Sequence, residues 1–177
     1  MMKRRGQVWI ETVLYTLIGL TLMGLALGFV MPKINEARDR AFVEQAITSL
    51  SDLDEKMSSV IQTGTGNVRQ TELLMKRGEF YVDANSNEIG MILRDLTKPY
   101  SEPGVEIDIG RIKVNSSVGP KTSTVYLRAV YSVNITYRGE DMDKKFTAAS
   151  APYKLLMENK GSSGGQIWIN IDEISNR

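Results

Sequence analysis

The stretch from Thr12 to Pro32 constrains this chain more than any other feature of its sequence. It reads TVLYTLIGLTLMGLALGFVMP and carries no formal charge. A helix over this stretch would rise about 30 Å, which is enough to cross the hydrocarbon core of a bilayer. Lys3, Arg4 and Arg5 precede it. Because basic flanks stay in the cytoplasm, we expect a single membrane-crossing helix with the rest of the chain outside.

Two ordinary interpretations of such a segment are a signal anchor and a secretory signal peptide. A conventional signal peptide is cleaved behind small residues at the end of its apolar stretch. Here Met31 and Pro32 stand at that place, followed by KINEARDR. We therefore do not expect conventional cleavage.

Helical periodicity continues beyond the membrane-crossing length. Apolar residues recur at spacings of mostly three and four from Ile34 to Ile61, with charged and polar residues between them. TGTGN then predicts a stop. The sequence predicts one helix from about Val8 to Ile61, roughly 80 Å long. Its first part, 7–32, is apolar all round, and its second part, 33–61, is amphipathic.

The composition excludes several functional classes. The chain has no cysteine and no histidine, and its formal net charge is +1. Disulfides and thiolate metal sites cannot form, and the commonest general base is missing. A nearly balanced charge gives no attraction to nucleic acid. We expect no enzyme, no catalytic residues, no metal, no cofactor, no nucleic acid and no small-molecule substrate.

The amino-terminal residues form a recognisable pattern. A basic leader ends in Gly6, Gln7 follows, and Glu11 is the fifth residue counted from Gln7, at the start of the unbroken apolar segment. Over roughly residues 3–32 this resembles a type IV pilin precursor, and Gln7 resembles the archaeal branch of that family. The resemblance implies that a prepilin peptidase cuts between Gly6 and Gln7 and removes residues 1–6.

The same resemblance implies what happens to the mature chain. The apolar helix stays as a membrane anchor and later, with the pilus assembly platform, becomes the core of a helical homo-oligomeric filament. Cleavage would create a positive amine on Gln7, and an unpaired amine is costly in low dielectric. Glu11, one helical turn along, could neutralise that amine on its own or a neighbouring subunit. The alternative is that Glu11 caps the helix at the membrane interface.

Three further residues in the helix are candidates for packing or bending. Gly24 and Gly28 form a G-x-x-x-G pattern, which permits close approach of helices in lipid, although glycine-rich apolar segments also give this pattern by chance. Pro32 removes the hydrogen bond to the carbonyl of Gly28. It could kink or loosen the helix, or be a harmless proline at the membrane edge.

Residues 62–177 are predicted to form a β-rich head domain. The clearest strand is TVYLRAVYSVNITY, residues 124–137, where apolar and polar residues alternate. VEIDIGRIKV predicts a second strand with a bulge at Gly110, and QIWINI a third. EFYV, KFTA and PYKLLM are weaker strands, EIGMILRDL is a strand or a short helix, and Leu73–Lys76 extends a small helix. The expected fold is α+β: the amphipathic helix packs Leu50, Leu53, Met57 and Val60 on an antiparallel sheet.

Three candidate sites lie in this domain. Asn115 and Asn134 begin N-glycosylation acceptor patterns, and Asn115 is the better candidate because it lies near a predicted loop. Asp83, Asn85 and Asn87 mimic the start of a calcium loop. Its glycine and glutamate positions are occupied by other residues, which favours a polar turn. Glu106 and Asp108 share a strand face, and a solvated face is expected rather than acid–base catalysis.

The sequence therefore predicts a structural subunit of a type IV pilus-like extracellular filament that serves adhesion or surface attachment. It would be a single-pass membrane protein with a cytoplasmic amino terminus before assembly. One alternative is a single-pass anchored protein whose outer β domain binds an envelope component. Another is a minor pilin-like component of a secretion or motility machine. An enzyme ranks last.

Overall fold

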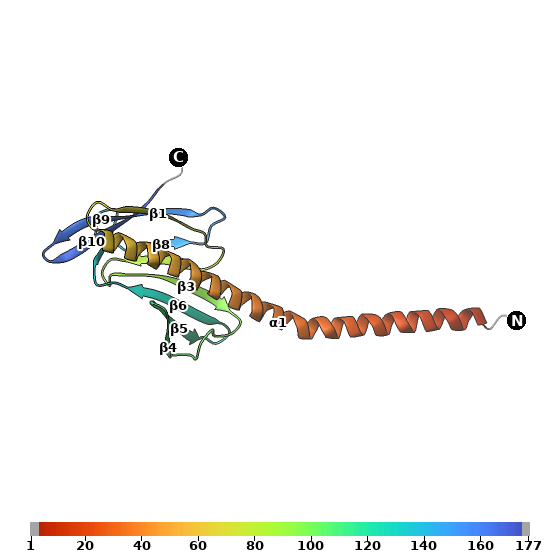
Figure 1. The fold of residues 1–177 in the computed structure, drawn as a ribbon. Helices are drawn as coiled ribbons and strands as arrows, with labels where there is room; N and C mark the ends of the chain where they lie inside the picture. Colours follow the sequence, from red (N-terminus) through yellow and green to blue (C-terminus); the bar gives the residue numbers. More distant parts are fainter. Residues whose placement is uncertain (1–3, 175–177) are drawn as a thin grey trace. The chain divides into compact units, whose positions relative to one another are not determined.

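The computed structural model describes residues 4–174, and side chains from Val8 to Ile174. One helix is followed by strands (Figure 1). The chain consists of two compact units, Met1–Arg38 and Asp39–Arg177. The elements are α1 (Arg4–Thr63), β1 (Val68–Leu73), β2 (Glu79–Asp83), β3 (Glu88–Leu96), β4 (Glu106–Ile109), β5 (Ile112–Val118), β6 (Ser123–Val130), β7 (Asn134–Tyr137), β8 (Lys144–Thr147), β9 (Tyr153–Ser163) and β10 (Gln166–Glu173).

The first unit is the amino-terminal part of α1. The helix begins at Arg4, earlier than the predicted start near Val8, so its backbone runs through the Gly6–Gln7 bond. Lys3 lies outside the described residues, and the structure describes no side chains for Arg4, Arg5 and Gln7.

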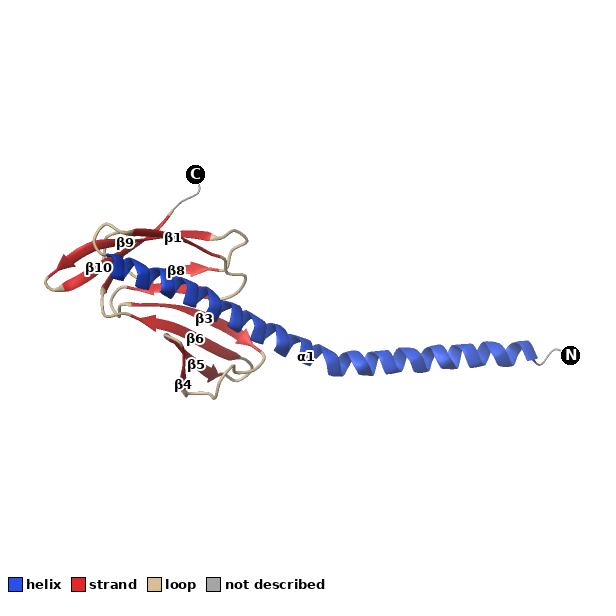
Figure 2. Cartoon of the chain, viewed as in Figure 1, coloured by secondary structure: helices blue, strands red, loops and turns tan. Residues whose placement is uncertain are grey.

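The second unit combines the rest of α1 with two β-sheets (Figure 2). The four-stranded sheet has the order β1-β9-β10-β7, and the six-stranded sheet has the order β4-β5-β6-β3-β2-β8. All pairs are antiparallel except β10 and β7, which run parallel. The predicted α+β class is confirmed, with two mainly antiparallel sheets where the sequence predicted one.

The core of the second unit lies between α1 and the two sheets. Leu50, Leu53, Met57 and Val60 are fully buried, as their helical spacing predicted. Burying each such side chain stabilises the fold by about 1.5–3 kcal/mol. The part of α1 from Asp39 onward therefore belongs to the head domain. The other core residues of α1 and the sheets include Val43, Ile47, Phe80, Ile89, Leu93, Ile112, Val114, Leu127, Ile135, Tyr137, Leu155, Met157, Ile169 and Ile171.

The helix ends where TGTGN predicted a stop. Gly64 and Gly66 both have positive φ, 95° and 80°, a conformation that glycine adopts without strain. The Asn159 side chain, buried on β9, donates a hydrogen bond to the carbonyl of Val60 (3.1 Å). One of the last helical carbonyls is thus satisfied by the four-stranded sheet.

The predicted long strand over residues 124–137 is wrong in one respect. It breaks into β6 and β7, which belong to different sheets. Asn87 holds the break: its carbonyl accepts from the Tyr131 amide (3.0 Å) and its side-chain oxygen accepts from the Ile135 amide (2.8 Å). The alternation of buried residues continues through the break, because both sheets face the same core.

Other boundaries also differ from the prediction. Gly110 is not a bulge: with Arg111 it forms a two-residue turn, since Ile109 pairs with Ile112. Its φ of 62° fits the turns that twist with a hairpin. Leu73–Lys76 is not helical, because Leu73 ends β1 in register with Tyr153. EIGMILRDL is strand β3, and the predicted strands EFYV, KFTA, PYKLLM and QIWINI are confirmed as β2, β8, β9 and β10.

Candidate assembly segment in the apolar half of the helix

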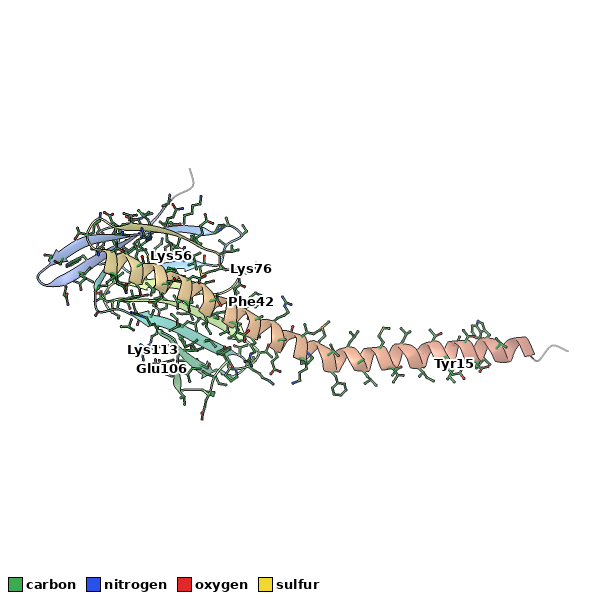
Figure 3. The ribbon with its side chains drawn as sticks, in the orientation of Figure 1. Tyr15, Phe42, Lys56, Lys76, Glu106 and Lys113 are labelled. Carbon is green, nitrogen blue, oxygen red and sulfur yellow. The ribbon has the colours of Figure 1, made fainter. Side chains whose placement is uncertain are left out.

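The apolar part of α1 exposes its large side chains. In the stretch that is long and apolar enough to cross a membrane, no residue is buried. Trp9 is 71% and Phe29 is 80% exposed, whereas Leu50 further along the same helix is 0% exposed. Tyr15 stands out from the helix in the same way (Figure 3). A contiguous apolar surface of this kind requires lipid or other protein around it.

Three threonine hydroxyls within this segment are satisfied by the helix itself. The hydroxyls of Thr12, Thr16 and Thr21 each donate to the carbonyl four residues earlier, at 2.9, 2.8 and 2.8 Å. A hydroxyl bonded in this way leaves no donor unpaired in an apolar medium. These three threonines are therefore compatible with burial in lipid or in a bundle of helices.

Glu11 is exposed and is the sole charged residue between Val8 and Pro32. None of the side chains described, which begin at Val8, forms an ion pair with it. The helix begins at Arg4, so Glu11 is not in its first turn, and the alternative that Glu11 caps the helix is not supported for the uncleaved chain. The predicted pairing with the Gln7 amine stays a prediction.

Gly24 and Gly28 line an open part of the helix surface. A methyl group added to either glycine would meet no heavy atom within 4 Å. Neither glycine is therefore needed to make room within its own chain. The open surface permits close approach of a second helix, and it fits equally a pattern that arose by chance, since Gly19 is just as open. The packing role stays a prediction.

Pro32 lies inside α1, and the helix continues on both sides of it. The loosened stretch that Pro32 could cause is not present in the single chain. Proline lacks an amide hydrogen, so the carbonyl of Gly28 loses its usual helical donor. The helix therefore has one hydrogen bond fewer at this place.

The two N-glycosylation patterns lie in strands. The prediction that Asn115 lies near a loop is wrong: it is half-buried within β5, paired with Glu106 on one side and Tyr126 on the other. Asn134 begins the edge strand β7. The Thr136 hydroxyl of its acceptor pattern is buried and hydrogen-bonded to Asn170 (3.1 Å). Both patterns are thus held in folded β structure.

The other two candidate sites of the head domain have structural roles. The Asp83 carboxylate accepts from the Ser86 amide (2.9 Å) and forms the predicted polar turn. Among the described residues no cluster of acids could hold a metal ion. Glu106 binds Lys113 (2.8 Å) and Arg128 (2.5 Å). Glu106 and Lys113 are labelled in Figure 3. The hydrogen bond from Lys113, together with Arg128, lowers the pKa of Glu106, so it stays ionised.

One cluster was not found from the sequence. Asp39 accepts from Arg77 Nη1 (2.6 Å) and from the amide and the hydroxyl of Thr97 (both 2.6 Å). Burial raises the pKa of Asp39, but the hydrogen bonds from Thr97 and Arg77 outweigh it and lower the pKa. These residues, which we call the Asp39 clamp, come from α1, the β1–β2 connection and the end of β3. Nothing in their sequence spacing indicates the contact.

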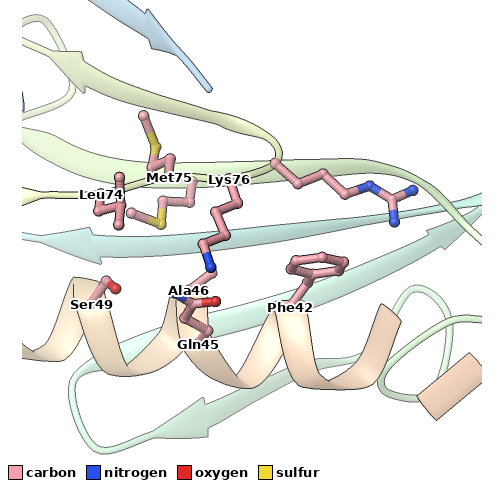
Figure 4. Close-up of a pocket in the computed structure, with 9 residues that line it drawn as sticks. Phe42, Gln45, Ala46, Ser49, Leu74, Met75 and Lys76 are labelled. Atoms are coloured by element: carbon pink, nitrogen blue, oxygen red, sulfur yellow. The ribbon is translucent and has the colours of Figure 1, made fainter. Parts of the chain in front are cut away.

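A shallow pocket lies beside the clamp, between α1 and the β1–β2 connection (Figure 4). Its volume of about 20 Å³ has room for a single water molecule, so it is too small for a substrate or cofactor. The ring of Phe42 lies on its wall, 5.9 Å from the Arg77 guanidinium. Its lining residues are Phe42, Gln45, Ala46, Ser49, Leu74, Met75, Lys76, Arg77 and Met91.

The structure thus presents one helix with an apolar, exposed first part and a second part built into the core of a β domain. Comparison of the chain with family models, with curated proteins and with solved structures gave no match.

Proposed function

We propose that this chain is the structural subunit of a type IV pilus-like extracellular filament, anchored in the membrane before assembly. The observation that carries the proposal is the exposure of the apolar part of α1 on every side. Such a surface suits lipid before assembly and the same segment of other copies afterwards. The second unit has its own core, and none of the core residues comes from that surface.

During assembly, the apolar helix would exchange the lipid around it for the helices of neighbouring copies. A prepilin peptidase would remove residues 1–6, and the apolar helices would then leave the bilayer and pack side by side. Glu11 would set the axial register by pairing with the amine of Gln7 on a neighbouring copy. In a low-dielectric core an uncompensated amine costs several kcal/mol, so registers that leave it unpaired are disfavoured.

A substitution at Glu11 tests this role. We expect Glu11→Ala to leave processing intact but to reduce the yield of sheared filaments by about tenfold or more, since the amine loses its partner. Glu55→Ala is the matched control, because Glu55 is an exposed acid on the same helix outside the apolar segment. Full-length filaments at normal yield from Glu11→Ala would count against the proposal.

A single-pass anchored protein that binds an envelope component is the second candidate. The same helix supports it, because one helix of this length and apolarity is sufficient as an anchor. That protein would keep Met1–Gly6 and tolerate the loss of Glu11. A minor pilin-like component would instead be processed but scarce in sheared filaments.

A further inference from the structure

The six-stranded sheet ends in two edge strands of complementary character. Its order places β4 at one edge and β8 at the other, and all neighbouring strands in it are antiparallel. With six strands in alternation, β4 and β8 run in opposite directions. A second copy set beside the first by simple displacement would therefore bring its β4 antiparallel to β8. Edge strands of this kind are templates for strand addition.

The backbone groups that face outward on these edges match. Ile109 and Ile112 flank a two-residue turn and so form a hydrogen-bonded pair, which leaves the amides and carbonyls of Glu106 and Asp108 facing the free edge. On β8 the Ala148 amide donates to the Gly78 carbonyl of β2 (3.2 Å). By alternation, Lys145 and Thr147 face the free edge there.

One register of β4 against β8 pairs these outward-facing backbone groups and also sets compatible side chains opposite each other. With Asp108 opposite Lys145, Glu106 lies opposite Thr147. In this register the apolar Ile107 also falls opposite Phe146, and each residue meets one on its own face of the sheet.

The charges favour this register. The Asp108 side chain is 68% exposed, with one distant partner, Lys113 at 3.6 Å. Lys145 is exposed and makes no ion pair among the described residues. Opposite charges facing each other across strands stabilise a pair. Two β4 edges would instead set Glu106 against Asp108, which repel.

We propose that β4 of one copy adds to β8 of a second copy, extending the six-stranded sheet from head to head. The contact is heterologous: after two copies join, one still has a free β4 and the other a free β8, so the addition is open-ended. The Thr147 carbonyl also accepts from the Tyr153 hydroxyl (2.8 Å), and it has a second lone pair for the ladder. This contact goes beyond the proposed function, because copies anchored side by side in a membrane could form it without a filament.

Engineered disulfides test the contact, and the absence of cysteine makes the test clean. In the full-length chain in its membranes, we expect oxidised Asp108→Cys/Lys145→Cys to give dimers, trimers and higher multimers. A hydrogen-bonded antiparallel pair has a Cα separation of about 5.5 Å, which a disulfide spans. Each single variant can give dimers at most. Asp52→Cys/Lys145→Cys, which places one cysteine on the exposed face of α1, should also give no ladder.

A second cysteine pair leaves Asp108 and Lys145 in place, so their charges can be changed separately. It also serves as a control in case the first double variant does not fold. Glu106→Cys/Thr147→Cys should give the same ladder. Adding Asp108→Lys should reduce it several-fold, and adding Lys145→Asp as well should restore it. Both cysteine pairs stopping at dimers, or Asp108→Lys leaving the ladder unchanged, would overturn the contact. Absence of the ladder together with normal filaments would refute this contact alone, whereas a ladder on chains that form no filaments would refute the proposed function alone.

Discussion

At the scale of single residues, the Asp39 side chain on α1 is bound by residues of the β1–β2 connection and of the end of β3. Asp39 is the first residue of the second unit, and its side chain is 13% exposed. The Arg77 guanidinium that it binds also donates to the Arg94 carbonyl (3.1 Å) and to the carbonyl of Asp95. Asp95 has a positive φ of 59°, which a residue with a side chain rarely adopts. The Asp39 clamp therefore also holds a strained turn at the end of β3.

Asp39→Asn tests the clamp through its dependence on pH. We expect the free energy of unfolding to fall by about 1–2 kcal/mol near neutral pH, since hydrogen bonds to a charged group are lost. The pKa of Asp39 is lowered from its ordinary value of 3.8. Its contribution is therefore complete above that value and is lost as the pH falls through the lower pKa of the folded state.

The measurement is urea unfolding of the detergent-solubilised chain from about pH 7 to about pH 3. The difference between the native chain and Asp39→Asn should shrink over the acid part of this range. Asp52→Asn is the control, because Asp52 is an exposed acid on the same helix. A difference that is independent of pH would show that Asp39 does not act through its charge.

A second buried carboxylate gives an independent test at this scale. Asp54 on α1 is 8% exposed and accepts from the Tyr131 hydroxyl (2.8 Å) at the break between β6 and β7. We expect Tyr131→Phe to lower the free energy of unfolding by about 1–3 kcal/mol, since the buried carboxylate of Asp54 loses a hydrogen-bond donor and is left with Arg111 at 3.4 Å. Tyr126→Phe, at a tyrosine that is 41% exposed on β6, should change it by less than about 0.5 kcal/mol. Equal effects of the two variants would contradict the role of the Tyr131–Asp54 bond.

At the scale of elements, periodicity predicted the helix and most strands because each buries a regular set of side chains in one core. The buried set of α1 and the alternation over residues 124–137 were right for this reason. The break at Tyr131 could not be predicted, because it depends on Asn87, far away in the sequence. The Asp39 clamp and the sheet order also depend on contacts between distant segments. In the apolar segment from Thr12 to Pro32, the exposure of the side chains followed from the composition. The pairing of Glu11 with an amine could not be predicted in the same way, because it depends on other molecules.

Gly24 and Gly28 give a prediction about the apolar half of the helix as an element. We expect Gly24→Leu/Gly28→Leu to lower filament yield, because larger side chains would hold neighbouring helices apart. The unfolding of the head domain should be unchanged, since a methyl group added at either glycine would meet no heavy atom within 4 Å. Gly19→Leu is the control, because Gly19 is equally open but lies on another face of the helix. Filament counts by electron microscopy measure the outcome, and equal losses for the control and the double variant would assign the pattern to chance.

At the scale of the whole molecule, the chain consists of two compact units. In the first, no residue is buried from Val8 to Arg38, the part whose side chains the structure describes, and the second has its own core. A membrane anchor and a filament subunit both need this division. They differ in whether residues 1–6 are removed, since only removal creates the amine that Glu11 could neutralise.

The amino terminus of the protein purified from its native membranes tests that difference most directly. Intact mass and terminal peptide mapping would identify the first residue. We predict that the mature chain begins at Gln7, with residues 1–6 removed and the apolar helix intact. A mature chain that keeps Lys3 to Gly6 would contradict the filament proposal and leave an anchored binding domain.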